Sequence, residues 1–187
     1  TIADYLKNND SMTLVFECID PVNDPHIIKY AKAKLVLLDA IYNELTFNKV
    51  PYNELCTIAE KLGVEVKECS HVLKDWEAFR ELYNDTLAED YQLNGEYIEG
   101  YVFEDANGFM VKVKSGYYQL WKKLRGVEDQ TLRCGYITRT GMLTSAIDNY
   151  FYGFCRERFN VDRDATTKSY PYNTDIISMR ERFFASR

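Results

Sequence analysis

The segment YIEGYVFEDANGFMVKVKSGYY, residues 97–118, carries the clearest structural pattern in the chain. Its two apolar runs, at 97–104 and 109–114, are interspersed with polar residues and are typical of β-strands. The DANG sequence between them is typical of a hairpin turn, because Asn-Gly readily takes the positive φ angles that tight turns need. The segment therefore predicts an antiparallel β-hairpin.

Upstream of the hairpin, predicted strands alternate with predicted helices. Short apolar runs indicate strands at residues 12–18, 27–30, 34–42 and 64–67. A helix is expected from Pro51 to Leu62, because apolar side chains recur on one face and Gly63 follows as a stop signal. Asp75 can cap a second helix, whose aromatic side chains recur at helical spacing.

Downstream of the hairpin, the pattern is helical. An amphipathic helix is expected at 117–124, ended by Gly126, and further helices are expected at 142–159 and from about 174 to 187. The predicted fold class is therefore α+β, with antiparallel strands followed by a small helical C-terminal region.

Composition excludes several classes of protein. The 187 residues are 46% hydrophobic, yet no apolar run approaches the ~20 residues of a membrane helix, so a membrane-spanning protein is not expected. The net charge of −6 argues against a uniformly basic nucleic-acid coat. Five widely spaced cysteines without a CxxC pair indicate reduced thiols in an intracellular protein, and two histidines are too few for a histidine-based metal centre.

Positive charge is concentrated in one part of this acidic chain. Residues 112–139 hold seven basic and two acidic residues, a net charge of +5. A solvated helix face is the usual explanation for such a run, and a strip that faces phosphate groups is the alternative. The basic residues are Lys112, Lys114, Lys122, Lys123, Arg125, Arg133 and Arg139.

Two carboxylates interrupt predicted strands. Glu17 lies in an otherwise apolar strand, where it must point at solvent, a cation or a ligand, and strand alternation toward solvent is the simplest reading. Glu99 is followed by Gly100, and a glycine inside a strand often marks the close approach of a ligand or of another backbone. A β-bulge with a surface glutamate is the alternative for this second site.

A pair of lysines follows on the second strand of the hairpin. Lys112 and Lys114 are two residues apart, so both ammonium groups project from the same face of a strand. Two adjacent like charges are explained if an anion such as a polyphosphate lies between them. The alternative is an edge strand protected from aggregation by lysine.

Taken together in this order, these segments resemble the later motifs of covalent nucleotidyltransferases, which include ATP-dependent ligases and mRNA capping enzymes. The closest likeness is to phage-type ATP-dependent RNA ligases of the RNA ligase 1-like branch, over about residues 12–125, and it implies a partial, ATP-grasp-like ligase domain. Three motifs carry the resemblance: FExxxPxN at Phe16, Glu17, Pro21 and Asn23; EGYV at residues 99–102; and KxKS at residues 112–115, followed by aromatic residues.

The resemblance implies a three-step reaction on RNA. A lysine attacks the α-phosphate of ATP to form lysyl-AMP, AMP passes to an RNA 5′-phosphate, and an RNA 3′-hydroxyl displaces AMP to seal the strand. The resemblance further implies that Lys112 and Lys114 contact the α-phosphate and offset its charge in the transition state. Glu99 would hold Mg²⁺, which prefers carboxylate and phosphate oxygens.

The remaining nucleotide contacts also follow from the resemblance. Glu17 would bind the nucleoside through its ribose, Leu35 would pack against the adenine, and Gly100 would lie at the nucleotide. Beyond the pocket, Lys122, Lys123 and Arg125 are expected on a helix that faces RNA or is merely solvated.

One motif of the family is missing from this sequence. The nucleophilic lysine of such ligases lies in a KxDG motif well before the FE strand, whereas the nearest string here, Lys7-Asn8-Asn9-Asp10, lacks both the spacing and the glycine. We therefore expect residues 1–125 to be a partial adenylylation domain and residues 126–187 a helical C-terminal region, with a missing N-terminal part of the same polypeptide. The fragment alone is expected to be inactive.

The same resemblance implies the cellular location of the parent enzyme. It is expected to be cytoplasmic, and the likeness to phage ligases leaves a phage origin open. The alternative from another class is a non-catalytic nucleotide- or RNA-binding module that derives from a nucleotidyltransferase and has lost its lysine.

Overall fold

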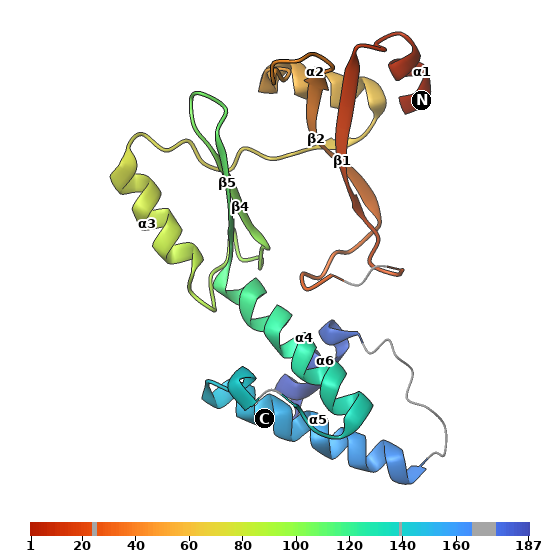
Figure 1. Cartoon of the computed structure of the whole chain (residues 1–187), viewed down its shortest axis with the longest axis vertical. Coiled ribbons are helices and arrows are strands. Elements are labelled where there is room, and N and C mark those ends of the chain that lie inside the picture. The colour runs from red at the N-terminus through yellow and green to blue at the C-terminus, as the bar shows by residue number, and fades with distance from the viewer. Residues whose placement is uncertain (24–25, 139, 166–174) are drawn as a thin grey trace. The chain divides into compact units, whose positions relative to one another are not determined.

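The structure is a computed structural model that describes residues 1–23, 26–138, 140–165 and 175–187. It divides into two compact units, whose elements are labelled in Figure 1. Unit 1 comprises residues 1–26 and 30–72, and unit 2 comprises residues 27–29 and 73–187. The fold is α+β, with mostly antiparallel strands and a helical C-terminal region, as predicted.

Unit 1 is built on a three-stranded sheet in the order β1-β2-β3. Strands β1 (Met12–Ile19) and β2 (Lys34–Tyr42) pair antiparallel, and the short β3 (Glu65–Val66) pairs parallel with β2. These three strands confirm the predictions at 12–18, 34–42 and 64–67. The unit also contains two helices, α1 (Ile2–Lys7) and α2 (Tyr52–Leu62).

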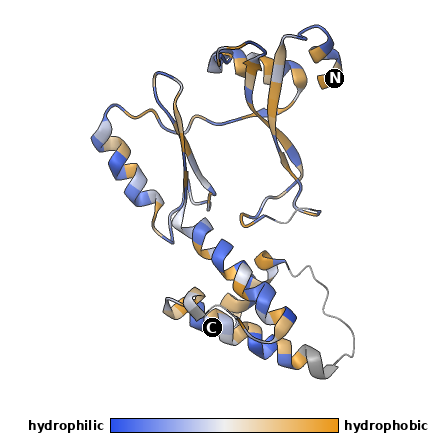
Figure 2. Ribbon diagram, in the orientation of Figure 1, coloured by the Kyte–Doolittle hydropathy of each residue, from blue (hydrophilic) through white to orange (hydrophobic). Residues whose placement is uncertain are grey.

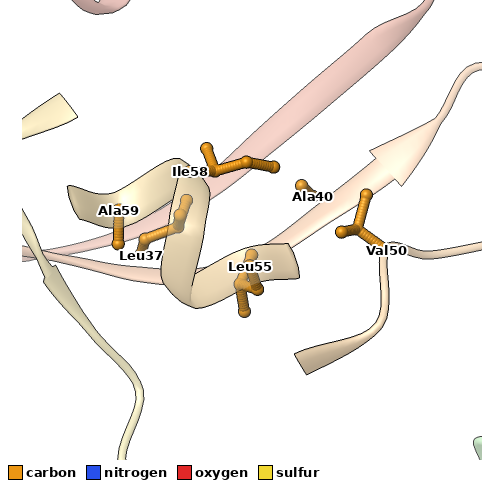
Figure 3. Close-up of a cluster of buried hydrophobic side chains, with 6 residues drawn as sticks. All are labelled: Leu37, Ala40, Val50, Leu55, Ile58 and Ala59. Atoms are coloured by element: carbon orange, nitrogen blue, oxygen red, sulfur yellow. The ribbon is translucent and has the colours of Figure 1, made fainter. Parts of the chain in front are cut away.

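Helix α2 supplies half of the core of unit 1. It ends where predicted, because Gly63 takes a left-handed φ of 67° and its amide donates to the carbonyl of Ala59. A bulge where Val15 meets Phe16 leaves Leu38 of β2 unpaired, so that Leu37 and Ala40 both face the helix although they are three residues apart. Figure 3 shows the resulting cluster of Leu37, Ala40, Val50, Leu55, Ile58 and Ala59.

The predicted strand at 27–30 is wrong. These residues form no strand, and Ile27 and Ile28 are buried in unit 2 instead. Arg180 donates a hydrogen bond of 3.0 Å to the carbonyl of Ile27, and Lys29 forms an ion pair of 2.6 Å with Glu181. A short apolar run signals burial, but periodicity alone does not distinguish pairing with a strand from packing against a helix.

The hairpin predicted in the sequence forms one part of unit 2. Strands β4 (Gly100–Glu104) and β5 (Met110–Lys114) pair antiparallel, and Gly108 takes a φ of 81° in the turn. The Asp105 carboxylate accepts hydrogen bonds from the amides of Asn107 and Phe109, which closes the turn. These bonds hold the pKa of Asp105 below its usual value.

Helix α3 (Trp76–Thr86) packs on one face of the hairpin. Asp75 caps it as predicted, by accepting a hydrogen bond of 2.9 Å from the amide of Ala78. Phe79 meets Phe103 of β4 edge to face, with ring centroids 4.8 Å apart. Polar and apolar colours alternate around this helix in Figure 2, because only one of its faces is covered.

Three further α-helices complete the described part of unit 2: α4 (Gly116–Cys134), α5 (Ala146–Ala165) and α6 (Ile176–Ala185), with the short 3-10 helix η1 (Thr140–Met142) before α5. The predicted end of the first of these helices at Gly126 is wrong. The buried face of α4 continues through Val127 and Thr131, and the helix stops only at Gly135, which has a φ of 80°.

The starts of the last two helices also differ from prediction. The segment at Met142 is a 3-10 turn, and α5 begins after Ser145, whose hydroxyl accepts a hydrogen bond from the amide of Asp148. Thr174, the predicted start of the last helix, lies outside the described residues, among which α6 begins at Ile176. Aromatic side chains hold these helices together at Trp121, Phe151 and Phe183.

Two charged groups are anchored inside the helical part of unit 2. The buried Asp148 carboxylate lies 2.6 Å from the Lys123 ammonium and accepts hydrogen bonds from the amides of Thr144 and Ser145. Burial raises the pKa of Asp148, but these hydrogen bonds outweigh it and leave the pKa below its usual value. The second group is the guanidinium of Arg180, which is 5.3 Å from the ring centroid of Trp121.

Candidate functional site

The structure divides the predicted site residues between the two units. Unit 1 holds Glu17 and Leu35. Unit 2 holds Glu99, Gly100, Lys112 and Lys114, all at the hairpin.

The two lysines share one face of the hairpin, as strand alternation predicts. The register pairs Lys112 with Val102 and Lys114 with Gly100. Phe103, which follows Val102 on β4 and therefore points to the other face, packs against α3. The lysine face is therefore the face that α3 leaves uncovered. Because neighbouring strand residues rise by about 3.4 Å, the two side chains leave the backbone roughly 7 Å apart.

Glu99 immediately precedes β4 and forms an ion pair with the ammonium group of Lys114. Both side chains are largely buried, with 27% and 26% of their surfaces exposed. Lys112 is exposed on the same face, and within the described ranges no carboxylate pairs with it. Strand alternation also places Glu104 on this face, next to the turn, so the face carries two carboxylates and two ammonium groups, with Glu99 and Lys114 paired at its other end.

Gly100 is required by the partner strand. It has a φ of +142°, and a Cβ atom at this position would lie 2.0 Å from the carbonyl oxygen of Val113. A glycine inside a strand is explained by the close approach of a ligand or of another backbone, and the structure shows the second of these. The placement of Gly100 at a bound nucleotide stays a prediction.

Ser115 fixes the backbone around the Glu99–Lys114 pair. Its side chain is fully buried, and its hydroxyl donates a hydrogen bond of 2.7 Å to the carbonyl of Ile98. The same hydroxyl accepts a hydrogen bond from the amide of Tyr118 and so caps α4, while the Ser115 amide donates to the carbonyl of Glu99. The serine that ends the KxKS motif therefore joins the end of β5 to the residues before β4.

Tyr118 extends the cationic surface from the hairpin onto α4. The ammonium group of Lys114 lies 4.6 Å from the centroid of its ring, and that of Lys122 lies 5.7 Å from it. From the sequence alone, Tyr118 is identified only as an aromatic residue that follows the KxKS motif. The four-residue spacing from Lys114 to Tyr118 to Lys122 is the signal that could have revealed this cluster.

The three basic residues that were grouped in the sequence separate in the structure. Lys122 and Arg125 are exposed on α4, whereas Lys123 is held by the buried Asp148. Lys123 therefore stabilises the contact between α4 and α5, and its expected place on a solvated or RNA-facing surface is wrong.

In unit 1, Glu17 projects from the sheet face opposite to the core. Its neighbour Phe16 packs against the core cluster, so alternation turns Glu17 away from α2. Glu17 is exposed, and among the described residues it has no cationic partner. The register places Val36 beside Glu17 on this face, and places Leu35 opposite Cys18 on the other face. The adenine contact predicted for Leu35 thus does not share a face with Glu17.

Most other charges on the Glu17 face are paired. Asp39 lies 3.1 Å from the ammonium of Lys67 and 3.6 Å from that of Lys49. Lys34 pairs with Glu65, and this hydrogen bond lowers the pKa of the Glu65 carboxyl. A carboxylate that is exposed and unpaired, such as Glu17, remains able to accept hydrogen bonds from a hydroxyl group.

A metal site built from protein ligands alone is not found. No three His, Cys, Asp or Glu side chains gather in the part of the chain that the structure describes. Mg²⁺ is commonly held by one or two carboxylates together with substrate phosphates. Glu99, a carboxylate beside the lysine pair, fits such a shared site. None of the described helices has the length and apolar character needed to cross a membrane.

Comparison with known families agrees with the motifs on the hairpin and on β1. The family model described as RNA ligase, of the T4 RNA ligase 1 type, matches residues 1–118. The chain belongs to this RNA ligase family. The matched region includes β1 with Glu17 and the whole hairpin, and it ends at Tyr118. No curated protein matches the chain in a sequence search.

Proposed function

We propose that this chain carries the later nucleotide-binding motifs of an ATP-dependent RNA ligase that joins RNA 5′-phosphate and 3′-hydroxyl ends. Residues 1–125 are then part of the adenylylation domain, and residues 126–187 are its helical C-terminal region. The observation that supports this most strongly is the hairpin face, where Lys112, Lys114 and Glu99 lie together at the motifs of the RNA ligase family.

The lysine pair suits the first step of the reaction. A lysine nitrogen forms a bond to the α-phosphorus of ATP, the bond from that phosphorus to the bridging oxygen breaks, and pyrophosphate leaves with its electron pair. Negative charge grows on the phosphate oxygens during this step, and fixed ammonium groups stabilise it. Lys112 and Lys114 share one strand face, and this arrangement supports their proposed role in stabilising that charge.

Glu99 is proposed to hold Mg²⁺ or the water around it. The metal supplies positive charge to the phosphate oxygens when it is bound. Lys114 lies against Glu99, so one side chain offers an oxygen ligand and the other an ammonium donor at the same place. Ser115 and Gly100 keep the backbone of both residues fixed. Glu17 is proposed to bind the ribose, since it is exposed and unpaired among the described residues.

The attacking lysine is proposed to come from outside these 187 residues, because they contain no KxDG motif. The chain alone then forms no lysyl-AMP. The same absence favours a second candidate, a non-catalytic nucleotide- or RNA-binding module.

Incubation with α-labelled ATP and Mg²⁺ separates the two candidates. Two polypeptides are compared: this chain, and the reading frame extended upstream to include a KxDG lysine. The ligase proposal expects covalent label only in the extended polypeptide, stable in alkali and released by acid as for a phosphoramidate bond, and expects its loss in folded Glu99→Ala. Label on this chain alone would contradict the missing nucleophile. An extended polypeptide that folds and binds ATP without becoming labelled would support the binding module.

A further inference from the structure

The exposed face of α4 carries positive charge that no carboxylate of the described residues neutralises. Lys122 and Arg125 are exposed and three residues apart, so they lie on one side of the helix. Within the part of the chain that the structure describes, neither of them pairs with a carboxylate. The neighbouring charges are different, because Lys123 is paired with Asp148 and Arg133 is paired with Asp129.

Tyr118 connects these helix charges to the hairpin. Its ring has the ammonium of Lys114 at 4.6 Å and that of Lys122 at 5.7 Å from its centroid. Cation–π attraction holds both ammonium groups near one ring, although like charges repel. From Lys112 on β5 the positive charges continue through Tyr118 to Arg125, and the helical part from Tyr118 to Arg125 extends about 10 Å.

This cationic track, defined as Lys112, Lys114, Tyr118, Lys122 and Arg125, contrasts with the rest of the chain. Residues 112–125 contain five basic residues and no acidic residue, whereas the chain as a whole has 29 acidic and 23 basic residues. On α4, Lys122 and Arg125 of the track are exposed, and Tyr118 is partly exposed. A local excess of accessible positive charge on an acidic protein indicates a polyanionic partner.

We infer that the cationic track binds the phosphodiester backbone of single-stranded RNA, next to the RNA end that reacts at the hairpin. This inference rests on the proposed function, since one end of the track consists of the lysines proposed to contact the transferred phosphate. Single strands bind to proteins through basic side chains along the backbone and aromatic rings near the bases, and the track offers both. Contacts to the phosphate backbone carry no sequence information, so this binding should be independent of base sequence.

The test is fluorescence anisotropy with a labelled single-stranded RNA of about twelve nucleotides, at several salt concentrations. The double variant Lys122→Gln/Arg125→Gln removes two proposed contacts. For single strands each phosphate contact contributes about 0.7 to the slope of log affinity against log salt, so the slope should decrease in magnitude by about 1.4. At low salt the affinity should fall on the order of tenfold, and ATP binding should be retained.

The matched control is Lys61→Gln/Lys74→Gln, which changes the net charge equally at two exposed positions that do not belong to the track. It should leave the salt slope unchanged. Tyr118→Phe should bind RNA as the wild type does, whereas Tyr118→Leu should weaken binding, because only the aromatic ring is needed to hold the two ammonium groups. All variants are first compared by circular dichroism, so that a change in helix content is recognised.

Each outcome decides for or against the track. If the wild type binds RNA and the track variant has the same salt slope as the control variant, RNA binding by the track is refuted while the proposed function stands. If the wild type binds no RNA, both RNA binding by the track and the proposed function are refuted. Loss of ATP binding in the track variant to the same degree as RNA binding would refute a separate RNA surface. Equal competition by polyglutamate would refute the choice of RNA over an acidic polypeptide.

Discussion

Removal of the Ser115 hydroxyl tests how the fold holds the candidate site. Ser115→Ala deletes a fully buried hydroxyl that donates to the carbonyl of Ile98 at 2.7 Å and accepts from the amide of Tyr118 at 3.1 Å. One bond fixes the backbone before Glu99, and the other caps α4. The substitution leaves both backbone groups without this partner.

The magnitude follows from these two bonds. Loss of a helix N-cap costs about 1 kcal/mol, and a buried carbonyl left without its donor costs about 1–3 kcal/mol. The expected loss in the free energy of unfolding is therefore about 2–4 kcal/mol. For a protein of this size each kcal/mol lowers Tm by roughly 2–4 °C.

Urea unfolding followed by tryptophan fluorescence measures this loss. Both tryptophans, Trp76 and Trp121, belong to unit 2, so the signal reports on the unit that contains Ser115. Ser178→Ala is the control, because Ser178 is exposed on α6 and its hydroxyl donates only to the Asp175 carboxylate. The control should change stability by less than about 0.5 kcal/mol. If Ser115→Ala is no less stable than this control, the two hydrogen bonds of the Ser115 hydroxyl do not hold the hairpin to α4.

Three further predictions follow from buried groups. Asp148→Asn should cost about 2–3 kcal/mol at neutral pH, since hydrogen bonds to a charged group are lost. Because the pKa of Asp148 is lowered in the folded protein, this stabilisation is present above its ordinary value of 3.8 and is lost as pH falls below it, so the unfolding free energies of variant and wild type should converge in acid. Gly100→Ala should destabilise unit 2 by more than about 3 kcal/mol, because a Cβ would collide with the Val113 carbonyl at a positive φ; unchanged urea unfolding would contradict the described register. Burial raises the pKa of the Cys155 thiol, so Cys155 should resist a thiol reagent in native protein and react in urea, whereas the exposed cysteines should react at once.

The hairpin could be predicted because its signals are local. The Asn-Gly turn, the strand alternation and the spacing of Lys112 and Lys114 all lie within about twenty residues, and the structure has this hairpin. The same holds for α2, which ends at Gly63. Helix α4 shows the limit of such signals, since Gly126 lies inside it while packing of the neighbouring residues continues the helix.

Features that depend on distant residues could not be predicted. Ile27 and Ile28 have strand composition, but their partners include Arg180 of α6, more than 150 residues away. Lys123 has the same local sequence signal as Lys122, and only the buried Asp148 of α5 distinguishes the two.

The register between β1 and β2 also could not be predicted from the sequence. Whether Leu35 or Val36 lies beside Glu17 depends on the pairing of β1 with β2, which a one-residue slip would reverse. The bulge at Val15 and Phe16 adds a further shift that no local pattern indicates.

The central claim is that the lysine face of the hairpin binds the phosphates of ATP. Lys112→Gln tests it most directly, because Lys112 is exposed and has no carboxylate partner among the described residues, so its removal leaves no buried charge behind. The measurement is the affinity of this chain for ATP with Mg²⁺ by isothermal titration calorimetry, with Lys61→Gln as the control. Loss of one charge-assisted contact should weaken binding by roughly ten- to hundredfold while unfolding is unchanged. An ATP affinity equal to that of the control would mean that Lys112 only protects an edge strand, and would contradict the account.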